Sequence, residues 1–315
     1  MLKHKIKWTD KTVVITGSGS GIGRSVAIAL AKKGATIHLI DLRQERITAL
    51  TEELSAEPGV CNNKIHGHTI DVTNPEKLQQ LATAIQIKVD ILINCAGILH
   101  QGKIATAANK ELHQVLDVNL WGAIYSIKSF LPLLKKSKEP NREQGSHIIN
   151  IASIAGLIGA PEMAIYNASK SAILGLTESL AIELAADNIH VAAVCPGSVK
   201  TNLGRDGRFS SESTAAHILR STIRSGVEPS RVAKDIIHVV EHSSLFKLSC
   251  VELHWQFLWL CKRLFPSLYP KLASTIYHKV LDKGWLESFL SLQPNIKHWL
   301  YQCVSKATLQ EYRRH

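Results

Sequence analysis

The sequence predicts an α/β fold, in which a doubly wound, mostly parallel sheet is covered by helices on both faces and followed by a helical C-terminal extension. Three observations carry this prediction. Short runs of Val, Ile and Leu alternate with helical segments along residues 12–241, as in parallel sheets whose strands are buried on both faces. A glycine-rich segment joins the first run to the first helical segment. The chain of 315 residues is also long enough to bury a substantial core.

The expected elements follow one another in a regular order. Residues 12–16, Thr-Val-Val-Ile-Thr, form a β-rich run, and the helix after it is expected to stop at Gly34, because glycine readily adopts the backbone that ends a helix. A second run, Thr-Ile-His-Leu-Ile, then resumes the strand pattern. We expect strands at residues 12–16, 36–40, 64–70, 90–94, 147–151 and 189–194. We expect helices at residues 24–33, 44–54, 75–86, 110–136, 163–186 and 229–241.

Composition changes after residue 242, so we expect an α/β domain over residues 1–242 and an extension over residues 243–315. The extension holds four of the six Trp, four of the six Tyr and four of the six Phe, with ten Lys or Arg against four Asp or Glu. Two compatible interpretations stay open. The extension packs on its own domain and walls an apolar substrate pocket, or it lies at an anionic membrane surface.

Composition and charge exclude several classes of protein. With 45% hydrophobic and 20% charged residues, the chain is globular rather than disordered. No apolar run approaches the ~20 residues that a membrane-spanning helix needs. The net charge of +11 suits an anionic cofactor, substrate or membrane. The densest basic cluster, residues 135–138, is too short to favour nucleic acid, and we expect no nucleic acid partner.

The cysteines and histidines do not predict a metal site. Six cysteines are scattered without a C-x-x-C pair, which indicates neither a disulfide framework nor a zinc site. His238, Glu241 and His242 match an H-x-x-E-H pattern, but the sequence offers no evident third ligand. The basic segment at residues 1–8 lacks the apolar stretch of a secretory signal. We therefore expect a cytoplasmic protein, which associates with membranes if its extension binds lipid.

The glycine-rich segment has the spacing Gly17-x-x-x-Gly21-x-Gly23 and lies between an expected strand and an expected helix. A pyrophosphate must approach backbone N–H groups and the helix N-terminus without intervening Cβ atoms, and glycine permits this approach. The segment therefore predicts a site for a dinucleotide.

Asp41 ends the second expected strand, 24 residues after Gly17. A carboxylate there accepts hydrogen bonds from the ribose hydroxyls of adenosine and repels a 2′-phosphate. Ser20 also stands where a basic residue would favour such a phosphate. We therefore expect NAD as the cofactor. Three arginines close in sequence leave NADP open, namely Arg24, Arg43 and Arg46.

A second group of residues has the character of a proton-transfer site. Tyr166 and Lys170 are four residues apart on an expected helix, so their side chains share a face. A nearby ammonium stabilises a phenolate, which makes Tyr166 a credible general acid/base. Ser153 follows the strand expected at residues 147–151, where its hydroxyl can hold a substrate oxygen. Asn119 is an amide in an apolar helix, which favours a hydrogen-bonded role.

With these residues in place, the sequence resembles a short-chain dehydrogenase/reductase over residues 10–242. The motifs stand in the family's order, and the set is far more specific than any single member. They are Thr16-Gly17-Ser-Gly-Ser-Gly21-Ile-Gly23, Asp71-Val72-Thr73, Asn94-Cys95-Ala96-Gly97, Asn119, Ser153, Tyr166-x-x-x-Lys170 and Cys195-Pro196-Gly197 with Thr201. The resemblance implies a Rossmann-like domain that binds NAD(P) and moves a hydride between the nicotinamide and a secondary alcohol or ketone.

The resemblance also implies a role for each matched residue. The catalytic set would be Asn119, Ser153, Tyr166 and Lys170. Asn119 would hold a water that relays protons to Lys170, which would also bind the nicotinamide ribose. Asp71 and Val72 would contact adenine, and the loop at residues 196–201 would meet the nicotinamide. The cofactor-binding set would be Gly17, Ser20, Gly21, Ile22, Gly23, Asp41, Asp71, Val72, Asn94, Ala96, Gly97, Tyr166, Lys170, Pro196, Gly197, Val199 and Thr201.

Two features depart from the family pattern. Cys95 stands where the family usually has Asn, which questions a structural hydrogen bond rather than catalysis. The long extension replaces the usual short C-terminus and questions the common tetramer, so we expect a homodimer.

We therefore expect an oxidoreductase for a hydrophobic small molecule, such as an acyl chain or a steroid-like ketone. The alternative is a regulatory or scaffold protein that binds the dinucleotide without turnover. The complete set of four catalytic residues argues against that alternative.

Overall fold

The computed structural model describes residues 6–136, 145–209, 219–220, 222–242, 246–250 and 253–281. Residues 1–5 of the basic N-terminal segment and residues 282–315 of the expected extension lie outside the described residues. The chain divides into two compact units, Met1–Val251 and Glu252–His315.

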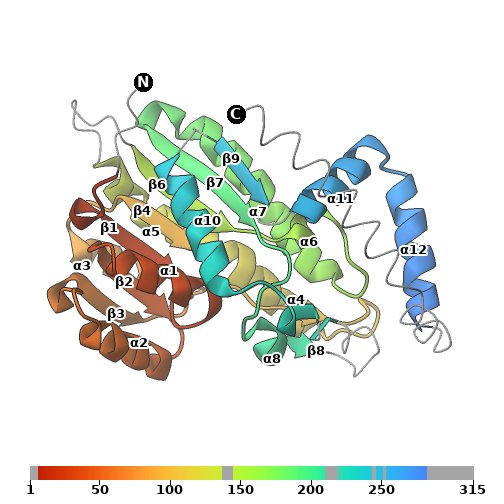
Figure 1. Ribbon diagram of the computed structural model, residues 1–315, viewed down its shortest axis with the longest axis horizontal. Coiled ribbons are helices and arrows are strands. Elements are labelled where there is room, and N and C mark those ends of the chain that lie inside the picture. The colour runs from red at the N-terminus through yellow and green to blue at the C-terminus, as the bar shows by residue number, and fades with distance from the viewer. Residues whose placement is uncertain are drawn as a thin grey trace. The chain divides into compact units, whose positions relative to one another are not determined.

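In the described part of the first unit, seven parallel strands form one sheet, in the order β3-β2-β1-β4-β6-β7-β9 (Figure 1). They are β1 (Thr12–Thr16), β2 (Thr36–Asp41), β3 (Ile65–Thr69), β4 (Ile91–Asn94), β6 (Ser146–Ile151), β7 (Ile189–Cys195) and β9 (Phe246–Cys250). The chain builds outward from β1 in one direction and then in the other. The doubly wound sheet predicted from the sequence is therefore confirmed, and its ligand crevice is expected at the carboxyl ends of the strands near β1 and β4.

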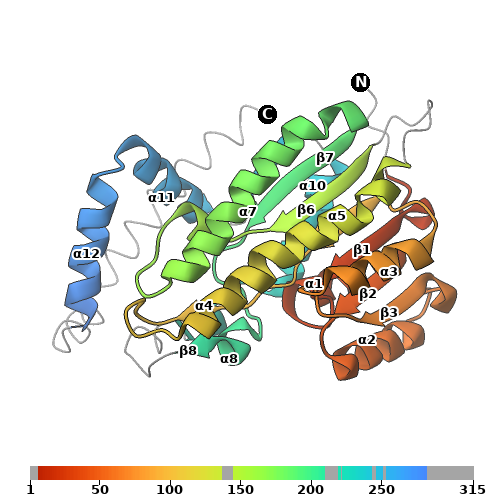
Figure 2. The ribbon, with the colours of Figure 1, turned by 180° about the vertical axis from the view of Figure 1, so that it is seen from behind.

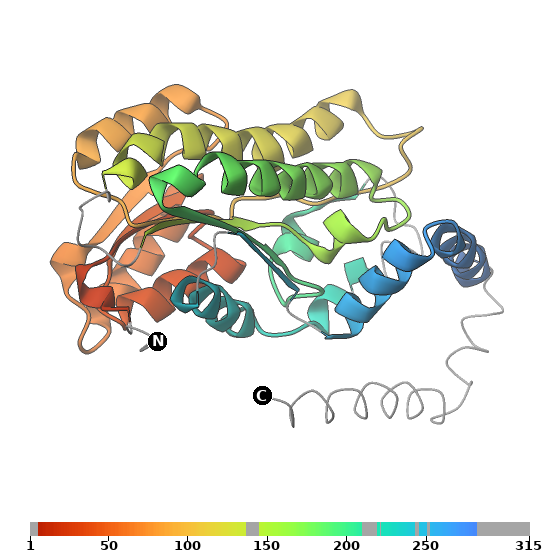
Figure 3. The same cartoon turned by 90° about the horizontal axis from the view of Figure 1, so that it is seen from above.

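Helices cover both faces of this sheet (Figures 2 and 3). They are α1 (Gly21–Ala31), α2 (Gln44–Ala56), α3 (Pro75–Ile85), α4 (Asn109–Leu116), α5 (Gly122–Lys135), α6 (Ile154–Leu157), α7 (Ala164–Glu183), α8 (Leu203–Asp206) and α10 (Pro229–Glu241). One core lies under α1, α2 and α10, and the other under α3, α5 and α7. Successive residues of β1 alternate between them, with Val13 and Ile15 in the first core and Val14 in the second.

Two of the expected helices differ in the structure, one in its first residue and one in its continuity. The first helix begins at Gly21 rather than at residue 24, because the glycine-rich turn leads directly into the first helical turn. The helix expected at residues 110–136 is divided into α4 and α5 by a π-helical turn, Asp117–Trp121. At the end of that turn, the Gly122 N–H donates to the carbonyl of Asp117, five residues earlier.

The first unit also extends beyond residue 242, the boundary expected from composition. Phe246–Cys250 forms β9 and pairs in parallel with β7, so the unit ends at Val251. Within the extension that the sequence predicts to be mostly helical, this segment is a strand. Its sequence, Phe-Lys-Leu-Ser-Cys, alternates apolar and polar residues with the period of a half-buried strand.

The second unit contains two described helices, α11 (Leu253–Leu264) and α12 (Leu268–Leu281). Large apolar side chains on and between them are exposed, namely Phe257, Leu260, Leu264, Phe265, Leu268 and Leu272. Arg263 places its guanidinium 5.6 Å from the centre of the Trp259 ring. No described helix of the chain is both long and apolar enough to cross a membrane.

Candidate active site

The glycine-rich turn between β1 and α1 leaves an open helix N-terminus. Gly17 has a φ of +64°, and a Cβ there would lie 2.7 Å from the Cα of Ala96. A Cβ at Gly23 would lie 2.3 Å from the Gly17 carbonyl oxygen, so both positions exclude a side chain. Ser20 precedes α1 without making a side-chain cap within the described structure, and the N–H groups of Gly21 and Ile22 begin the helix. These N–H groups and the helix dipole suit an anionic phosphate.

Asp41 lies beside this turn at the carboxyl end of β2. Its Oδ2 accepts a hydrogen bond from the Gly19 N–H at 3.0 Å, and its Oδ1 accepts one from the Arg43 N–H at 3.0 Å. Each carboxylate oxygen retains acceptor capacity for a further donor. The buried Asp41 side chain is therefore held in place and still able to accept hydrogen bonds from a diol.

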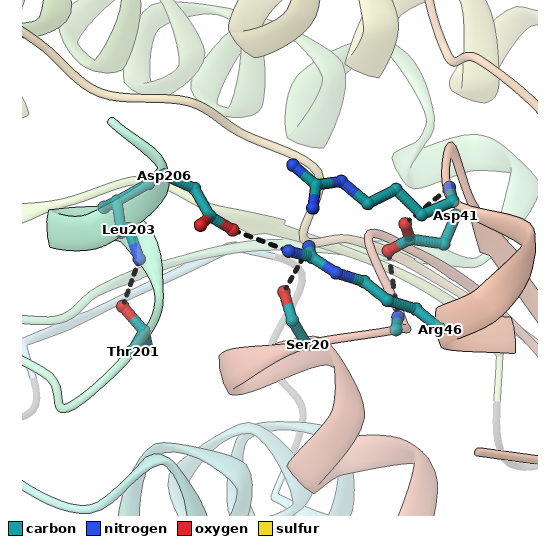
Figure 4. A network of polar contacts seen from close by, with 8 residues as sticks. Ser20, Asp41, Arg46, Thr201, Leu203 and Asp206 are labelled. Atoms are coloured by element: carbon teal, nitrogen blue, oxygen red, sulfur yellow. Dashed lines mark hydrogen bonds and ion pairs between the residues drawn. The ribbon is translucent and has the colours of Figure 1, made fainter. Parts of the chain in front are cut away.

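Arg46, one of the three arginines that leave NADP open, lies at the same end of the crevice. Its Nη1 donates to the Ser20 hydroxyl at 3.3 Å, and its Nη2 donates to Asp206 Oδ2 at 2.6 Å (Figure 4). Asp206 belongs to α8, far away in sequence, so only the folded chain brings the two residues together.

Asp71 and Val72 lie next to Asp41 at the sheet edge. The N–H of Ile70 donates to the Asp41 carbonyl at 2.9 Å, which sets the position of the residues after it. Asp71 Oδ1 accepts hydrogen bonds from the N–H and hydroxyl of Thr73 at 2.9 and 2.8 Å. Val72 is buried and packs against Gly122. A Cβ added at Gly122 would lie only 2.7 Å from the Val72 Cγ2.

Asn94 ends β4 with one unused polar atom. Its Nδ2 donates to Asn150 Oδ1 at 2.8 Å, whereas its buried Oδ1 has no hydrogen-bond partner among the described residues. The chain then passes Ala96, which approaches Gly17, and Gly97. A Cβ at Gly97 would lie 3.6 Å from the Lys170 Nζ. This segment therefore joins the glycine-rich turn to the residues of α7.

Tyr166 and Ser153 lie together at the carboxyl edge of β6. Ser153 is the N-cap of α6 and accepts a hydrogen bond from the Ala155 N–H at 3.1 Å. Burial raises the pKa of Tyr166 to about 12, and a hydrogen bond from Ser153 opposes this rise. The lowering of this pKa by a nearby ammonium, expected from the sequence, does not offset the effect of burial. The Lys170 nitrogen lies 5.9 Å from the centre of the phenol ring and is directed to a backbone carbonyl.

That carbonyl belongs to Ile151, and the Lys170 Nζ donates to it at 2.8 Å. That carbonyl lies in a buried region, and burial lowers the pKa of Lys170 to about 8. Burial also raises the pKa of the Cys95 thiol to about 12, so this thiol stays protonated at neutral pH. Cys95 therefore provides a neutral neighbour for the lysine.

Asn119 lies in the π-helical turn and uses its side chain to join two segments. Its Oδ1 accepts from the Ile98 N–H at 2.8 Å, and its Nδ2 donates to the Ile98 carbonyl and to the Ser169 hydroxyl, each at 3.0 Å. Ser169 in turn donates to the Tyr166 carbonyl at 2.8 Å. The predicted hydrogen-bonded role of this amide is confirmed, and its partners are the backbone of Ile98 and the hydroxyl of Ser169.

The segment after β7 completes the crevice. The Pro196 carbonyl accepts from the Ile154 N–H at 2.9 Å, and after Gly197 the chain pairs Val199 with Val227. Thr201 then passes the glycine-rich turn, because a Cβ at Gly21 would lie 3.0 Å from its Cγ2. The structure thus brings the expected cofactor and catalytic residues to one edge of the sheet.

Comparison with known proteins identifies this arrangement. Residues 11–209 match the family described as short chain dehydrogenase. The chain belongs to the short-chain dehydrogenase family. It is 34% identical over 192 residues to dehydrogenase/reductase SDR family member 6 of Rattus norvegicus, covering 61% of this chain and 72% of that protein. It is also 34% identical over 197 residues to D-beta-hydroxybutyrate dehydrogenase of Rhizobium meliloti. This match covers 61% of this chain and 73% of that protein.

A solved structure agrees with the sequence comparison. A short-chain dehydrogenase/reductase from Burkholderia phymatum in complex with NAD matches with a TM-score of 0.74 and 27% identity, covering 84% of this chain and 96% of that one. This short-chain dehydrogenase is an NAD(P)-dependent oxidoreductase that acts on CH–OH groups and their carbonyl counterparts. The uncapped α1 N-terminus, the cradle at Gly17 and the unpaired Asn94 Oδ1 of the described structure fit such a dinucleotide.

An apolar cluster that no sequence motif predicts surrounds the phenol of the dehydrogenase. Its buried members are Leu99, Ala155, Tyr166 and Ile223, and its partly buried members are Met163, Leu203, Leu219 and Phe209. These residues come from five separate segments, so no local pattern marks them. The cluster becomes visible once the segment after β7 folds against the residues that follow β4.

The H-x-x-E-H segment of the dehydrogenase has a different use. Glu241 Oε1 accepts a hydrogen bond from the Trp8 indole at 3.0 Å and lies 3.6 Å from the Lys33 Nζ. This carboxylate anchors the residues before β1 to α10. Among the residues that the structure describes, no three His, Cys, Asp or Glu side chains form a metal-binding group.

Proposed function

We propose that this enzyme oxidises a hydrophobic secondary alcohol, or reduces the matching ketone, with Tyr166 as its general acid/base. The apolar cluster around the phenol is the observation that carries the choice of substrate. A substrate oxygen that reaches Tyr166 must be flanked by apolar side chains, and burial of each methylene contributes about 0.8 kcal/mol.

Each residue of the catalytic set has a distinct role in this proposal. The bound dinucleotide supplies the hydride acceptor or donor at its nicotinamide ring. In oxidation, the Tyr166 phenolate removes the hydroxyl proton while the Ser153 hydroxyl orients the oxygen. In reduction, the phenol, whose raised pKa keeps it protonated at neutral pH, donates that proton to the carbonyl oxygen. Lys170 holds α7 to β6 and places a positive charge near the phenol.

Asn119 acts as a positioning residue rather than as a proton carrier through its side chain. All of its amide hydrogen bonds go to Ile98 and Ser169. Ser169 bonds the carbonyl of Tyr166, so the amide supports the backbone that carries the phenol. The water relay implied by the family resemblance involves no side-chain atom of Asn119 in this proposal.

We propose NAD as the preferred cofactor, because Asp41 directs a held, buried carboxylate to the adenosine end of the crevice. Two ribose hydroxyls can donate to this carboxylate, whereas a 2′-phosphate is repelled. The other cofactor contacts proposed are the N–H groups of α1 for the pyrophosphate and the segment 196–201 for the nicotinamide.

A substrate series tests the proposed function. The full chain is assayed with NAD⁺ on secondary alcohols of increasing chain length, such as 2-butanol, 2-hexanol, 2-octanol and 2-decanol. The expected kcat/KM rises by about threefold per added methylene, which corresponds to about 0.7 kcal/mol at room temperature. An efficiency that stays flat or falls with chain length contradicts the hydrophobic substrate, while turnover of any member still supports the reaction class.

We propose that the second unit contacts anionic lipid through α11 and α12. Phe257 and Leu264 expose 66% and 62% of their surface, although they lie on one helix face. Residues 253–281 contain Lys262, Arg263, Lys271 and Lys279 without any Asp or Glu. Apolar side chains with flanking cations are the features that support interfacial binding.

We also propose that the enzyme forms a homodimer through the outer surface of α5 and α7. These helices lie side by side on one face of the sheet (Figure 2). Ile182 of α7 is 77% exposed, and Trp121 at the start of α5 is 46% exposed. Light scattering on the Ile182→Arg variant, compared with an Ile87→Arg control, tests this interface. Equal masses for the variant, the control and the unmodified protein contradict it.

A further inference from the structure

The ion pair between Arg46 and Asp206 joins the two sides of the cofactor crevice. Arg46 lies on α2, beyond the adenosine end, and Asp206 lies on α8, in the segment that follows β7. The Nη2 and Oδ2 atoms are 2.6 Å apart, and the two side chains are only 19% and 27% exposed. Because both side chains are partly shielded from water, their charges are screened less than those of a fully exposed pair.

The stem of Arg46 lies at the ribose end of the site. A Cβ added at Gly19 would lie 2.6 Å from the Arg46 Cβ and 2.9 Å from Asp41 Oδ2. The Arg46 side chain and the Asp41 carboxylate therefore both lie against the side of Gly19 that a Cβ would occupy. A guanidinium is the side chain best suited to bind a phosphate, since it donates two parallel hydrogen bonds.

We propose that Asp206 is a specificity-determining residue that keeps Arg46 from binding the 2′-phosphate of NADP. The carboxylate occupies the guanidinium and adds a negative charge near the position of that phosphate. Ser20 adds a second hydrogen bond that holds the guanidinium toward Asp206. The inference rests on the proposed adenosine site at Asp41 and assigns a second source of NAD preference, on the opposite side of the crevice.

Binding of NAD⁺ and NADP⁺ to the full chain, measured by calorimetry without substrate, tests this proposal. The two probes differ only in the 2′-phosphate. In the Asp206→Asn variant, the ratio of the NADP⁺ Kd to the NAD⁺ Kd is expected to fall about tenfold, because a charge-assisted contact to phosphate becomes available. The Kd for NAD⁺ is expected to stay within about threefold.

Two further variants separate this effect from a general change of charge. Glu45→Gln removes the same charge from an exposed residue beside Arg46 and is expected to change the ratio by less than about twofold. In an Arg46→Gln background, Asp206→Asn is expected to have little effect, because the cation it releases is absent. Asp206→Ser replaces Asp206→Asn if the Asn variant melts at a lower temperature.

An unchanged ratio in the Asp206 variants contradicts the proposal, as does a shift that persists without Arg46. The proposed role of Asp41 fails separately. If the unmodified protein already binds NADP⁺ more tightly than NAD⁺, the preference assigned to Asp41 is wrong, while the change caused by Asp206→Asn still measures the role of Asp206.

Discussion

Lys170 and Tyr166 lie one turn apart on α7, with the lysine nitrogen 5.9 Å from the centre of the phenol ring. The lysine donates its hydrogen bond to the Ile151 carbonyl, at the end of β6, rather than to the phenol oxygen. One side chain therefore fixes the distance between helix and sheet and places a cation near the phenol. A substitution of Lys170 would remove both the helix–sheet hydrogen bond and the charge near the phenol. The role of the phenol is therefore tested by substitutions of Tyr166 that leave the lysine in place.

Replacing Tyr166 with Phe removes the phenol oxygen and keeps the ring in the apolar cluster. We expect turnover to fall by about 10²–10⁴, the usual worth of general acid–base catalysis, with the Kd for NAD⁺ within a few-fold. Tyr125→Phe, the same change on α5, is the matched control and should retain turnover. Near-normal turnover of Tyr166→Phe would remove Tyr166 from its proposed role.

Replacing Asp41 with Ala, together with Leu42→Arg, should move cofactor preference toward NADP. The change removes the repulsion of the 2′-phosphate and adds a cation at an exposed position. The ratio of kcat/KM with the two cofactors measures the shift, which we expect to be about tenfold or more. Leu42→Arg by itself is the control, and it should produce a smaller shift because Asp41 remains.

Stability should fall in acid because of His147. Burial lowers the pKa of His147 from 6.5 to about 3, so the unfolded chain binds a proton that the folded chain excludes between these values. The stability associated with the neutral imidazole is present above pH 6.5 and is lost as the pH falls toward 3. His147 by itself is expected to contribute a slope of about 1.4 kcal/mol per pH unit to the free energy of unfolding, to which His38, whose pKa burial also lowers to about 3, adds.

Urea unfolding of His147→Asn and of unmodified protein across this range measures the difference. The variant should lose part of the acid dependence, whereas His113→Asn, a change at an exposed histidine, should keep all of it. Parallel curves for unmodified protein and His147→Asn would show that His147 does not contribute to the acid sensitivity.

The second unit should bring the full chain to anionic vesicles. In flotation, we expect binding to vesicles that contain phosphatidylserine, and weaker binding as salt increases, because Lys262, Arg263 and Lys271 are screened. Phe257→Glu with Leu264→Glu should abolish flotation. Gln256→Glu with Ser267→Glu adds the same charge at exposed polar positions and should reduce binding less. Equal losses in both double variants would assign the interaction to charge without insertion of the apolar side chains.

The sheet and its helices could be predicted because their signals are local. Each buried strand is a run of apolar residues, and Gly17 and Gly34 mark sharp changes of direction that side chains disfavour. The position of Asp41 could be predicted for the same reason, since a strand of the expected length must end there. That Tyr166 and Lys170 share one face of a helix could be predicted from their spacing of four residues alone.

The features that the sequence did not predict depend on contacts between distant segments. The strand at Phe246–Cys250 forms only against β7, and its short alternating pattern stands within an aromatic, basic region that favours helices. Arg46 and Asp206 meet only after α8 folds over the crevice. The high pKa of Tyr166 reflects burial, which the distance between two residues in the sequence does not measure.

The π-helical turn at Asp117–Trp121 makes the active site sensitive to the number of residues in this segment. The turn closes with a bond over five residues where an α-helix closes over four, so it accommodates one extra residue. A single deletion within it would join α4 and α5 into one continuous α-helix with both flanks still in phase, and Phe130 would keep its place in the core. Asn119 would lose the widened turn that directs its amide to Ile98 and Ser169. The loss of one codon here would therefore act on the active site and leave the core in place.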